Sequence, residues 1–459
     1  MAETSTTAVT PEGIATTFSQ VAAWVSGRLV GCDGNFFGAG SDSRTITQGM
    51  LFIALKGPNH DGHDHVPTAA ERGIAAALVE RELPVGISQI IVADTHAALG
   101  HLGASWRQHL GLPLVAITGS NGKTTTKEMT AAILSHAGKT LATRGNLNND
   151  IGVPLTLMRL DDHYRYGVIE MGANHAGEIA YLVKLTRPQV AVITNAGAAH
   201  LEGFGSIEGV ARAKGEIYGG LDANGIAVIN ADDAHADLWR TLTTHCRVMS
   251  FGIDKPADVS AQWQGDARGS HLQLRTPAGI AEVKLLLPGR HNVLNALAAT
   301  AAALAMGVGL DAVVAGLEGL APVGGRLQVR IGLKGSTIID DSYNANPVSL
   351  RAGIDVLAAC QGRRYLALGD MGELGVDAER LHAEAGTYAR QAGIDRVYAT
   401  GPLSRQAVEA FGDRGYHFAD QQQLIAALKT ELDATVTVLV KGSRSSRMER
   451  VVAALTEES

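Results

Sequence analysis

The sequence predicts an α/β protein with parallel sheets, divided into three domains. Its 459 residues correspond to about three domains of roughly 150 residues each. The composition, 46% hydrophobic and 19% charged, is typical of a globular protein with a large core. Short apolar runs alternate with helical segments, which indicates parallel strands with helices on both faces of the sheet. We therefore expect domains at residues 1–111, 112–322 and 323–459.

Each expected domain has its own strands. The first has β-type runs at 50–55, 75–79 and 90–93, followed by an amphipathic stretch at 97–110. The second has apolar strands at 114–118, 167–170, 190–194 and 226–230. The third begins near the hinge signal at 322–325 and has strands at 337–340, 365–368, 396–400 and 436–440.

Polar residues close the strands of the second and third domains. Open α/β sheets bind ligands at the carboxyl ends of their strands, so this pattern predicts two facing ligand edges with a cleft between the two domains. Polar residues also close strands simply because loops begin there, and each one taken alone is ambiguous.

Composition excludes several functional classes. The net charge of −7 offers no basic face for nucleic acid. Cys32, Cys246 and Cys360 are few, odd in number and far apart, which predicts buried thiols in a reducing compartment. No signal peptide is visible at the N-terminus. The longest apolar stretch, 293–308, is Ala-rich and too short to cross a bilayer, so we expect a buried helix there and a cytoplasmic protein without a membrane span.

The most informative segment is the loop that follows the strand at 114–118. Glycines at 119 and 122 precede Lys123 and Thr124, and a helix is expected to follow. Backbone N–H groups of such a loop can hold phosphate oxygens, Lys123 adds a positive charge, and the Thr124 hydroxyl suits Mg²⁺. The full phosphate-loop pattern requires glycine at 117, where this chain has Ile117, so the loop is a shortened variant.

Three residues downstream could serve phosphoryl transfer. Glu170 closes a strand at a position suited to Mg²⁺. His200 follows another strand by a short loop, where either a metal contact or an ordinary surface histidine is expected. Lys214 lies in a helical segment and, taken alone, is typical of a solvated lysine.

Three polar segments have both a structural and a functional interpretation. Asn292 and Asn295 lie at i and i+3 at the start of a predicted helix, where they could approach a purine edge or cap the helix. The turn at 340–347 is either a plain Asn/Pro loop or a loop facing ribose or phosphate. The Asp/His-rich run at 59–65 is more typical of a solvated turn than of a metal site.

Together these segments resemble the Mur ligase family over nearly the whole chain. The similar segments include 42–44, 118–125, 149–154, 170–174, 194–200, 213–216, 340–347, 368–375 and 441–444. Within the family, the segments at 340–347 and 368–375 resemble the members that join D-alanyl-D-alanine to UDP-N-acetylmuramoyl-tripeptide. The Asp-Asn-Pro-Arg motif expected of a neighbouring member does not occur in the sequence.

The resemblance implies an N-terminal α/β domain that holds the UDP-sugar substrate, a central phosphate-loop domain that holds ATP, and a Rossmann-like C-terminal domain that closes over the dipeptide. The implied ATP-binding residues are Gly119, Ser120, Asn121, Gly122, Lys123, Thr124, Thr125, Asn292, Asn295, Arg326 and Asp341. Of these, the two asparagines at 292 and 295 would approach the adenine, Arg326 the γ-phosphate and Asp341 the ribose. The implied catalytic residues are Lys123, Glu170, His200, Lys214 and Arg326.

The resemblance also implies two Mg²⁺ ions and a set of substrate contacts. Thr124 and Glu170 would hold one ion, and His200 the other, with Lys214 as its carbamylated partner. The candidates for substrate binding are Ser43, Arg44, Lys56, Asn149, Asn346 and Arg444.

Carbamylation requires a neutral lysine. At the reference pKa of about 10.4, only roughly 0.04% of a lysine is neutral at pH 7. Partial burial would raise that fraction, and a nearby Mg²⁺ would stabilise the anionic product.

The reaction expected from the resemblance is ATP-driven amide formation through an acyl phosphate, carried out by a monomer. Another Mur ligase that adds a single amino acid, a folylpolyglutamate-type ligase, a phosphate-loop kinase or NTPase, and a non-catalytic scaffold remain alternatives. The third residue of the accepting tripeptide is left open.

Overall fold

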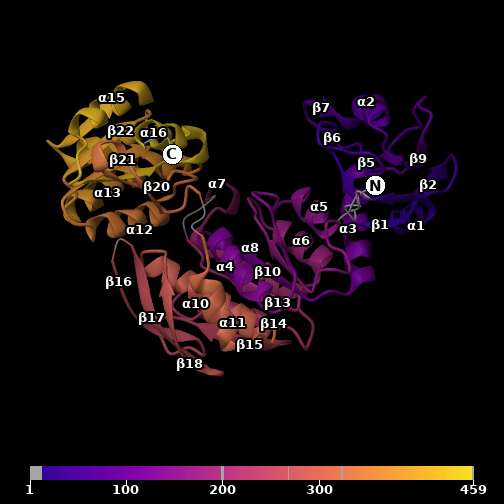
Figure 1. Ribbon diagram of the computed structural model, residues 1–459, viewed down its shortest axis with the longest axis horizontal. Helices are drawn as coiled ribbons and strands as arrows, with labels where there is room; N and C mark the ends of the chain where they lie inside the picture. Colours follow the sequence, from indigo (N-terminus) through magenta and orange to yellow (C-terminus); the bar gives the residue numbers. More distant parts are fainter. Residues whose placement is uncertain (1–12, 198–200, 267, 322–323, 457–459) are drawn as a thin grey trace, which may run out of the picture. The chain divides into compact units, whose positions relative to one another are not determined.

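The computed structural model describes residues 13–197, 201–266, 268–321 and 324–456 (Figure 1). They form two compact units. The first comprises the described residues within 1–116, 138–172 and 178–189, and the second those within 117–137, 173–177 and 190–459.

The N-terminal part of the first unit is built on a five-stranded sheet with the order β2-β9-β8-β5-β4. The strands are β2 (Arg28–Val30), β9 (Ser88–Ile91), β8 (Ala76–Val79), β5 (Leu51–Ile53) and β4 (Ala39–Gly40). Only β2 runs antiparallel to its neighbour among these pairs. Leu51 and Ile53 pack with α1 (Phe18–Trp24) and α3 (Thr95–Leu110), whereas Phe52 packs with α2 (Val66–Glu71) on the opposite face. Alternate side chains of β5 thus contact helices on opposite faces of this sheet.

The short elements of the first unit complete this part. Strands β1 (Ala15–Thr17) and β3 (Asn35–Phe37) pair antiparallel, as do β6 (Lys56–Gly57) and β7 (His60–Asp61). Helices α5 (Gly152–Leu157) and α6 (Glu178–Thr186) also belong to this unit.

The central sheet has six strands in the order β11-β12-β10-β13-β14-β15. They are β11 (Thr140–Ala142), β12 (Tyr166–Glu170), β10 (Leu114–Thr118), β13 (Val190–Ile193), β14 (Ile226–Asn230) and β15 (Arg247–Phe251). The pairs β11–β12, β13–β14 and β14–β15 are parallel, as predicted. The boundary between the two units falls inside β10, after Ala116.

Helices of the second unit surround the strands that carry the phosphate loop. They are α4 (Lys123–Ser135), α7 (Leu201–Phe204), α8 (Ile207–Gly215), α9 (Ala236–Leu242), α10 (Arg290–Ala305) and α11 (Leu310–Glu318). Helix α10 is buried along most of its length, which confirms the expected buried helix. Helix α4 packs against α10 and α11, and a Cβ on Gly316 would lie 2.5 Å from the Ile133 Cα, so the backbones of α4 and α11 touch.

A three-stranded antiparallel sheet in the second unit was not predicted. It contains β16 (Ser260–Asp266), β17 (Gly269–Thr276) and β18 (Gly279–Leu285). The signal was present, because Leu272 and Leu274 are buried while the residues between and beside them are more exposed. This alternation with a period of two is the pattern of a half-buried strand.

The C-terminal part of the second unit is a doubly wound sheet with the order β19-β20-β24-β21-β22-β23. The strands are β19 (Gln328–Ile331), β20 (Thr337–Asp341), β24 (Val436–Lys441), β21 (Arg363–Gly369), β22 (Arg396–Thr400) and β23 (Gly415–Phe418). Only β19 is antiparallel within this sheet.

Helices cover both faces of this C-terminal sheet. Helices α12 (Pro347–Ala358), α13 (Ala378–Gln391) and α14 (Ser404–Phe411) share one core, whereas α15 (Gln421–Glu431) and α16 (Glu449–Leu455) pack in the other. This arrangement, with helices on both faces of a mainly parallel sheet, confirms the Rossmann-like expectation.

Two further expectations can be compared with the structure. The three cysteines are free thiols, but Cys32 is exposed and the other two are only partly buried, so the expectation of buried thiols is wrong. Within the described residues, no helix is both long and apolar enough to cross a membrane. The domain boundaries at 111/112 and 322/323 stay predictions.

Candidate active site

The phosphate loop is shaped by two glycines whose positive φ values are strained for other residues. Gly119 has φ +151° and Gly122 has φ +80°. A Cβ at Gly119 would lie 1.8 Å from the Thr194 Oγ1, and a Cβ at Gly122 would lie 2.2 Å from the Asn295 Oδ1. Gly122 also caps α4, so the helix N-terminus begins directly at Lys123. The loop therefore approaches its supports too closely for any side chain, as a backbone cradle for phosphate requires.

The end of β13 holds this loop in place. The main-chain N–H groups of Ser120 and Asn121 donate to the Asn195 carbonyl and to the Asn195 Oδ1, both at 3.0 Å. The Thr194 hydroxyl donates to the Asn121 carbonyl at 2.6 Å. Thr194 and Asn195 were not among the predicted site residues, although their position at the polar end of a strand could have indicated that they belong to the site.

The loop offers groups that suit an anionic ligand. The Lys123 ammonium donates to the Gly119 carbonyl at 2.7 Å, so it lies against the loop itself. The Nδ2 of Asn121 is buried and makes no hydrogen bond to any of the described residues. An unsatisfied buried donor is costly unless something accepts its hydrogen bond. The backbone cradle, the lysine and this amide together fit the phosphates of a nucleotide.

Lys214 is a buried lysine whose pKa is strongly lowered. It lies in the last turn of α8 with 2% of its surface exposed, and its ammonium is 5.8 Å from the centre of the Phe204 ring. Burial, together with the positive charge of Lys123, lowers the pKa of Lys214 to about 7. The interpretation of Lys214 as a solvated lysine is therefore wrong, because the helix turns it into the core.

Asn292 and Asn295 lie together at the start of α10, as predicted. The Asn295 Nδ2 donates to the Asn292 Oδ1 at 3.2 Å, and the Asn292 Nδ2 donates to the Pro288 carbonyl at 2.8 Å. The Thr126 hydroxyl donates to the Asn295 Oδ1 at 3.3 Å. Both amides are buried and tie α10 to the first turn of α4.

Arg326 brings the C-terminal part of the chain to the phosphate loop. Its Nη2 donates to the Thr124 Oγ1 at 2.9 Å, and its guanidinium lies 4.5 Å from the centre of the Tyr343 ring. Asn346 reaches the same loop, because its Nδ2 donates to the Asn121 Oδ1 at 2.7 Å. Thr125, in the first turn of α4, is buried.

Asp341 ends β20 and forms an ion pair with Lys441, which ends β24. The Asp341 Oδ1 also accepts from the Leu327 N–H at 3.3 Å. Burial raises the pKa of Asp341, and the charge of Lys441 opposes that rise. His291 is half-buried, and desolvation together with the same Lys441 charge lowers its pKa to about 4.

The remaining predicted residues lie elsewhere or outside the description. Glu170 is buried in the first unit, where the Asn148 Nδ2 donates to its Oε1 at 2.8 Å. His200 lies outside the described residues. Arg444 is exposed in the second unit and pairs with Glu449 at 3.2 Å.

The candidates for UDP-substrate binding all lie in the first unit. The Arg44 side chain is 86% exposed and pairs with Asp42 at 2.8 Å, and its hydrogen bonds lower the pKa of Asp42 to about 2. Ser43 is half-buried and Lys56 is exposed. The Asn149 Oδ1 accepts from the Gly152 N–H, at the first residue of α5, at 2.9 Å.

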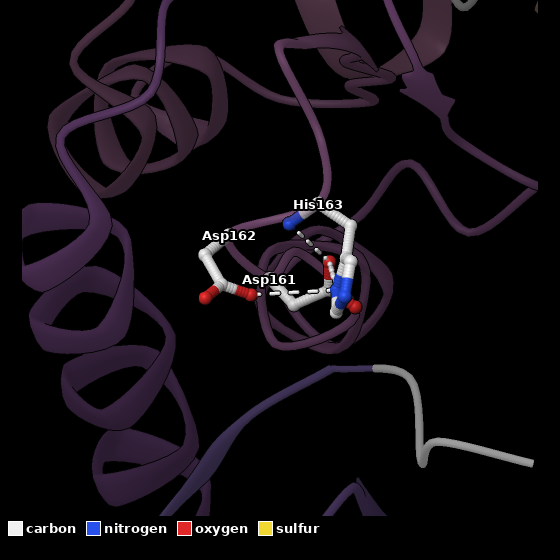
Figure 2. A group of neighbouring side chains, drawn as sticks. All are labelled: Asp161, Asp162 and His163. Atoms are coloured by element: carbon white, nitrogen blue, oxygen red, sulfur yellow. Dashed lines mark hydrogen bonds and ion pairs between the residues drawn. The ribbon is translucent and has the colours of Figure 1, made fainter.

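Asp161, Asp162 and His163 form a cluster with metal-ligand spacing (Figure 2). Asp161 is buried, and its two oxygens accept from the main-chain N–H groups of Gly13 at 3.2 Å and His163 at 2.9 Å. Because these donors already occupy the carboxylate, Asp161 anchors the start of the described chain. The histidines at 60–65 form no metal cluster within the described ranges, and His63 there is buried and accepts from the Glu80 N–H.

Three family descriptions match the chain. The catalytic domain of the Mur ligase family matches residues 36–107, the Mur ligase middle domain 117–303, and the glutamate ligase domain of Mur ligases 325–444. The chain is 48% identical to the UDP-N-acetylmuramoyl-tripeptide–D-alanyl-D-alanine ligase of Escherichia coli, over 97% of this chain and 99% of that protein.

Solved structures give the same result. The chain is similar to the crystal structure of MurF from Acinetobacter baumannii, with a TM-score of 0.92 and 38% identity over 97% of this chain and all of that one. It is also similar to the MurF ligase from Thermotoga maritima in complex with ADP, with a TM-score of 0.82 and 30% identity over 91% of this chain and 96% of that one.

Proposed function

This chain belongs to the Mur ligase family, and we propose that it adds D-alanyl-D-alanine to UDP-N-acetylmuramoyl-tripeptide with hydrolysis of ATP to ADP and phosphate. The product is the UDP-linked pentapeptide used for peptidoglycan. The observation that carries the proposal is the glycine cradle at 119–122, reached by Arg326 and Asn346 of the C-terminal part. Relatives named for this activity match nearly the full length of the chain.

ATP supplies a leaving group that a carboxylate lacks. The terminal carboxylate of the tripeptide attacks the γ-phosphorus, ADP leaves, and an acyl phosphate forms. The dipeptide amine then attacks the carbonyl carbon, the C–O bond breaks, phosphate leaves, and the amine gives up a proton. The chain contributes positioning and charge neutralisation, for which Lys123 and Arg326 are the proposed residues.

Asn292, Asn295 and Asp341 are the proposed contacts to adenosine. The two asparagines are already buried and hydrogen-bonded to each other, and Asp341 is held by Lys441. Such preformed positions are what a nucleoside pocket needs. Residues 119–125 are the proposed phosphate contacts.

Magnesium and a modified lysine belong to the same proposal. Thr124, Glu170 and His200 are the candidate ligands that the resemblance implies, and carbamylated Lys214 would add an anionic partner. With a pKa of about 7, about half of Lys214 is neutral at pH 7 and can react with CO₂. Carbamylation adds the lysine nitrogen to the carbon of CO₂ and releases one proton.

The substrate contacts of the tripeptide and dipeptide stay predictions, with Ser43, Arg44, Lys56, Asn149 and Arg444 as candidates. So do a monomeric state, a cytoplasmic location and closure of the C-terminal domain. A ligase that adds a single amino acid is the second candidate, because the same fold and phosphate loop would serve it.

The test is ADP release by the purified protein with UDP-N-acetylmuramoyl-tripeptide, with and without D-alanyl-D-alanine, followed by mass analysis of the product. We expect release to require both substrates and the product to gain one dipeptide. ADP release that does not depend on the two substrates, or ADP release that is faster with single amino acids than with D-alanyl-D-alanine, would contradict the proposal. A tripeptide series that varies the third residue identifies the natural acceptor.

A further inference from the structure

Asn346 performs two tasks at the start of α12. As the N-cap, its Oδ1 accepts from the Ser349 N–H at 2.9 Å, and the Ser349 hydroxyl accepts from the Asn346 N–H at 3.1 Å. The opposite end of its amide, the Nδ2, donates to the Asn121 Oδ1 at 2.7 Å. The two residues are 225 positions apart in the sequence, so this contact links the third expected domain directly to the phosphate loop.

The hydrogen bonds fix the orientation of both amides. Because the Ser349 N–H can only donate, the atom of Asn346 that faces it must be oxygen, and the atom that faces Asn121 must be nitrogen. The Asn121 atom that receives this hydrogen is then oxygen. The Asn121 Nδ2 is consequently the end turned away from Asn346, and it is the buried donor for which the described residues offer no acceptor.

The main chain of Asn121 is held separately. Its N–H donates to the Asn195 Oδ1, and its carbonyl accepts from Thr194 and from the Asn195 Nδ2 at 3.1 Å. The strand end thus fixes the path of the loop, and Asn346 fixes the direction of the Asn121 side chain. Helix α12 also lies close to Gly197, in the segment that follows β13, because a Cβ on Gly197 would be 3.5 Å from the Val348 Cγ2.

We propose that Asn346 is a positioning residue for nucleotide binding, which orients the Asn121 amide of the phosphate loop, rather than a contact to the dipeptide. The inference rests on the proposed function only in that the loop binds a nucleotide. Binding of a nucleotide then depends on α12 being seated on the loop. Loss of the Asn346 side chain should therefore weaken nucleotide binding and leave binding of the dipeptide unchanged.

The Asn346→Ser variant separates the two tasks. Serine is as good an N-cap as asparagine, so α12 keeps its start, but its hydroxyl is too short to reach Asn121. We expect Mg·ADP affinity, measured by titration calorimetry on the full-length protein, to fall about 5-fold, the size of one neutral hydrogen bond. The matched control is Asn344→Ser, at an exposed residue whose side chain instead accepts from the Ala345 N–H. It should bind ADP like the unaltered protein.

A double-mutant cycle completes the test. Asn121→Ala should weaken ADP binding at least as much as Asn346→Ser, and adding the serine to the alanine variant should cause no further loss. In the ligase assay, the KM for D-alanyl-D-alanine should change less than 2-fold in Asn346→Ser. Additive losses, unchanged ADP affinity, or a rise confined to the dipeptide KM would overturn the inference.

The two proposals fail in different ways. If the unaltered protein binds ADP but makes no amide with the dipeptide, the proposed function is wrong, while the ADP titrations still decide the role of Asn346. If ligation succeeds and Asn346→Ser binds ADP normally, only the inference about Asn346 is wrong.

Discussion

Replacement of Lys214 by methionine should make the protein more stable and inactive at the same time. Methionine has a similar length and carries no charge, so it fills the same buried space. The lysine pKa falls from 10.5 to about 7 on folding, a difference of about 3.5 units or roughly 5 kcal/mol of penalty on the buried ammonium. The group is almost fully buried, so solvent screens little of this penalty.

The sign of the pH dependence follows from linkage. Between pH 7 and 10.5 the unfolded chain holds the Lys214 proton more tightly than the folded protein, so the stability of the unaltered protein rises with pH across this window. Below pH 7 both states are protonated and the full penalty remains. The gap between Lys214→Met and the unaltered protein should therefore be largest below pH 7 and shrink by about 1.4 kcal/mol per pH unit above it.

The assay is the apparent melting temperature from pH 6 to 9 in CO₂-free buffer, together with ADP release. We expect Lys214→Met to melt several degrees higher at pH 6, with a smaller difference at pH 9, and to show no ligase activity. The matched control is Lys184→Met, at an exposed helical lysine, which should show no such pH-dependent gap. A Lys214→Met protein that melts lower at pH 6, or a gap that does not narrow, would refute the buried-cation argument. In ¹³C-bicarbonate, a carbamate signal present in the unaltered protein should be absent from the methionine variant.

Three further outcomes are expected. Gly122→Ala should weaken ADP binding at least about 10-fold, because the φ of +80° costs an alanine about 1–2 kcal/mol and the new Cβ would collide with the Asn295 side chain. The control Gly219→Ala, where no atom lies within 4 Å of the new Cβ, should bind ADP normally. Equal ADP affinities of the two variants in calorimetry would contradict this reasoning. Asp161→Ala should lower the urea midpoint by an amount equivalent to about 1–3 kcal/mol, because the buried Gly13 N–H and the partly buried His163 N–H lose their acceptor. Asp162→Ala, with an 88% exposed side chain, should leave the midpoint unchanged. Lys123→Ala should abolish ADP release, and retained turnover would reject its assigned role.

Local sequence patterns were sufficient to predict the parallel sheets and the phosphate loop. The strands at 114–118, 226–230 and 396–400 have the predicted bounds, and the others differ by a few residues at their ends. Runs of buried apolar residues and glycines at tight turns act over a few neighbouring positions, so they can be recognised without the fold. The antiparallel sheet at 260–285 was not predicted, although the alternation of buried and exposed residues along β17 is the pattern of a half-buried strand.

The sequence by itself determined the fold class, the nucleotide loop and the family resemblance, because each rests on residues close together in the chain. Only the tertiary structure decided that Lys214 is buried with a lowered pKa, since burial depends on what packs over α8. The same is true of the Asn346–Asn121 contact, which joins residues more than 200 positions apart. Desolvation and long-range hydrogen bonds are properties of neighbours in space, and no spacing along the chain specifies them.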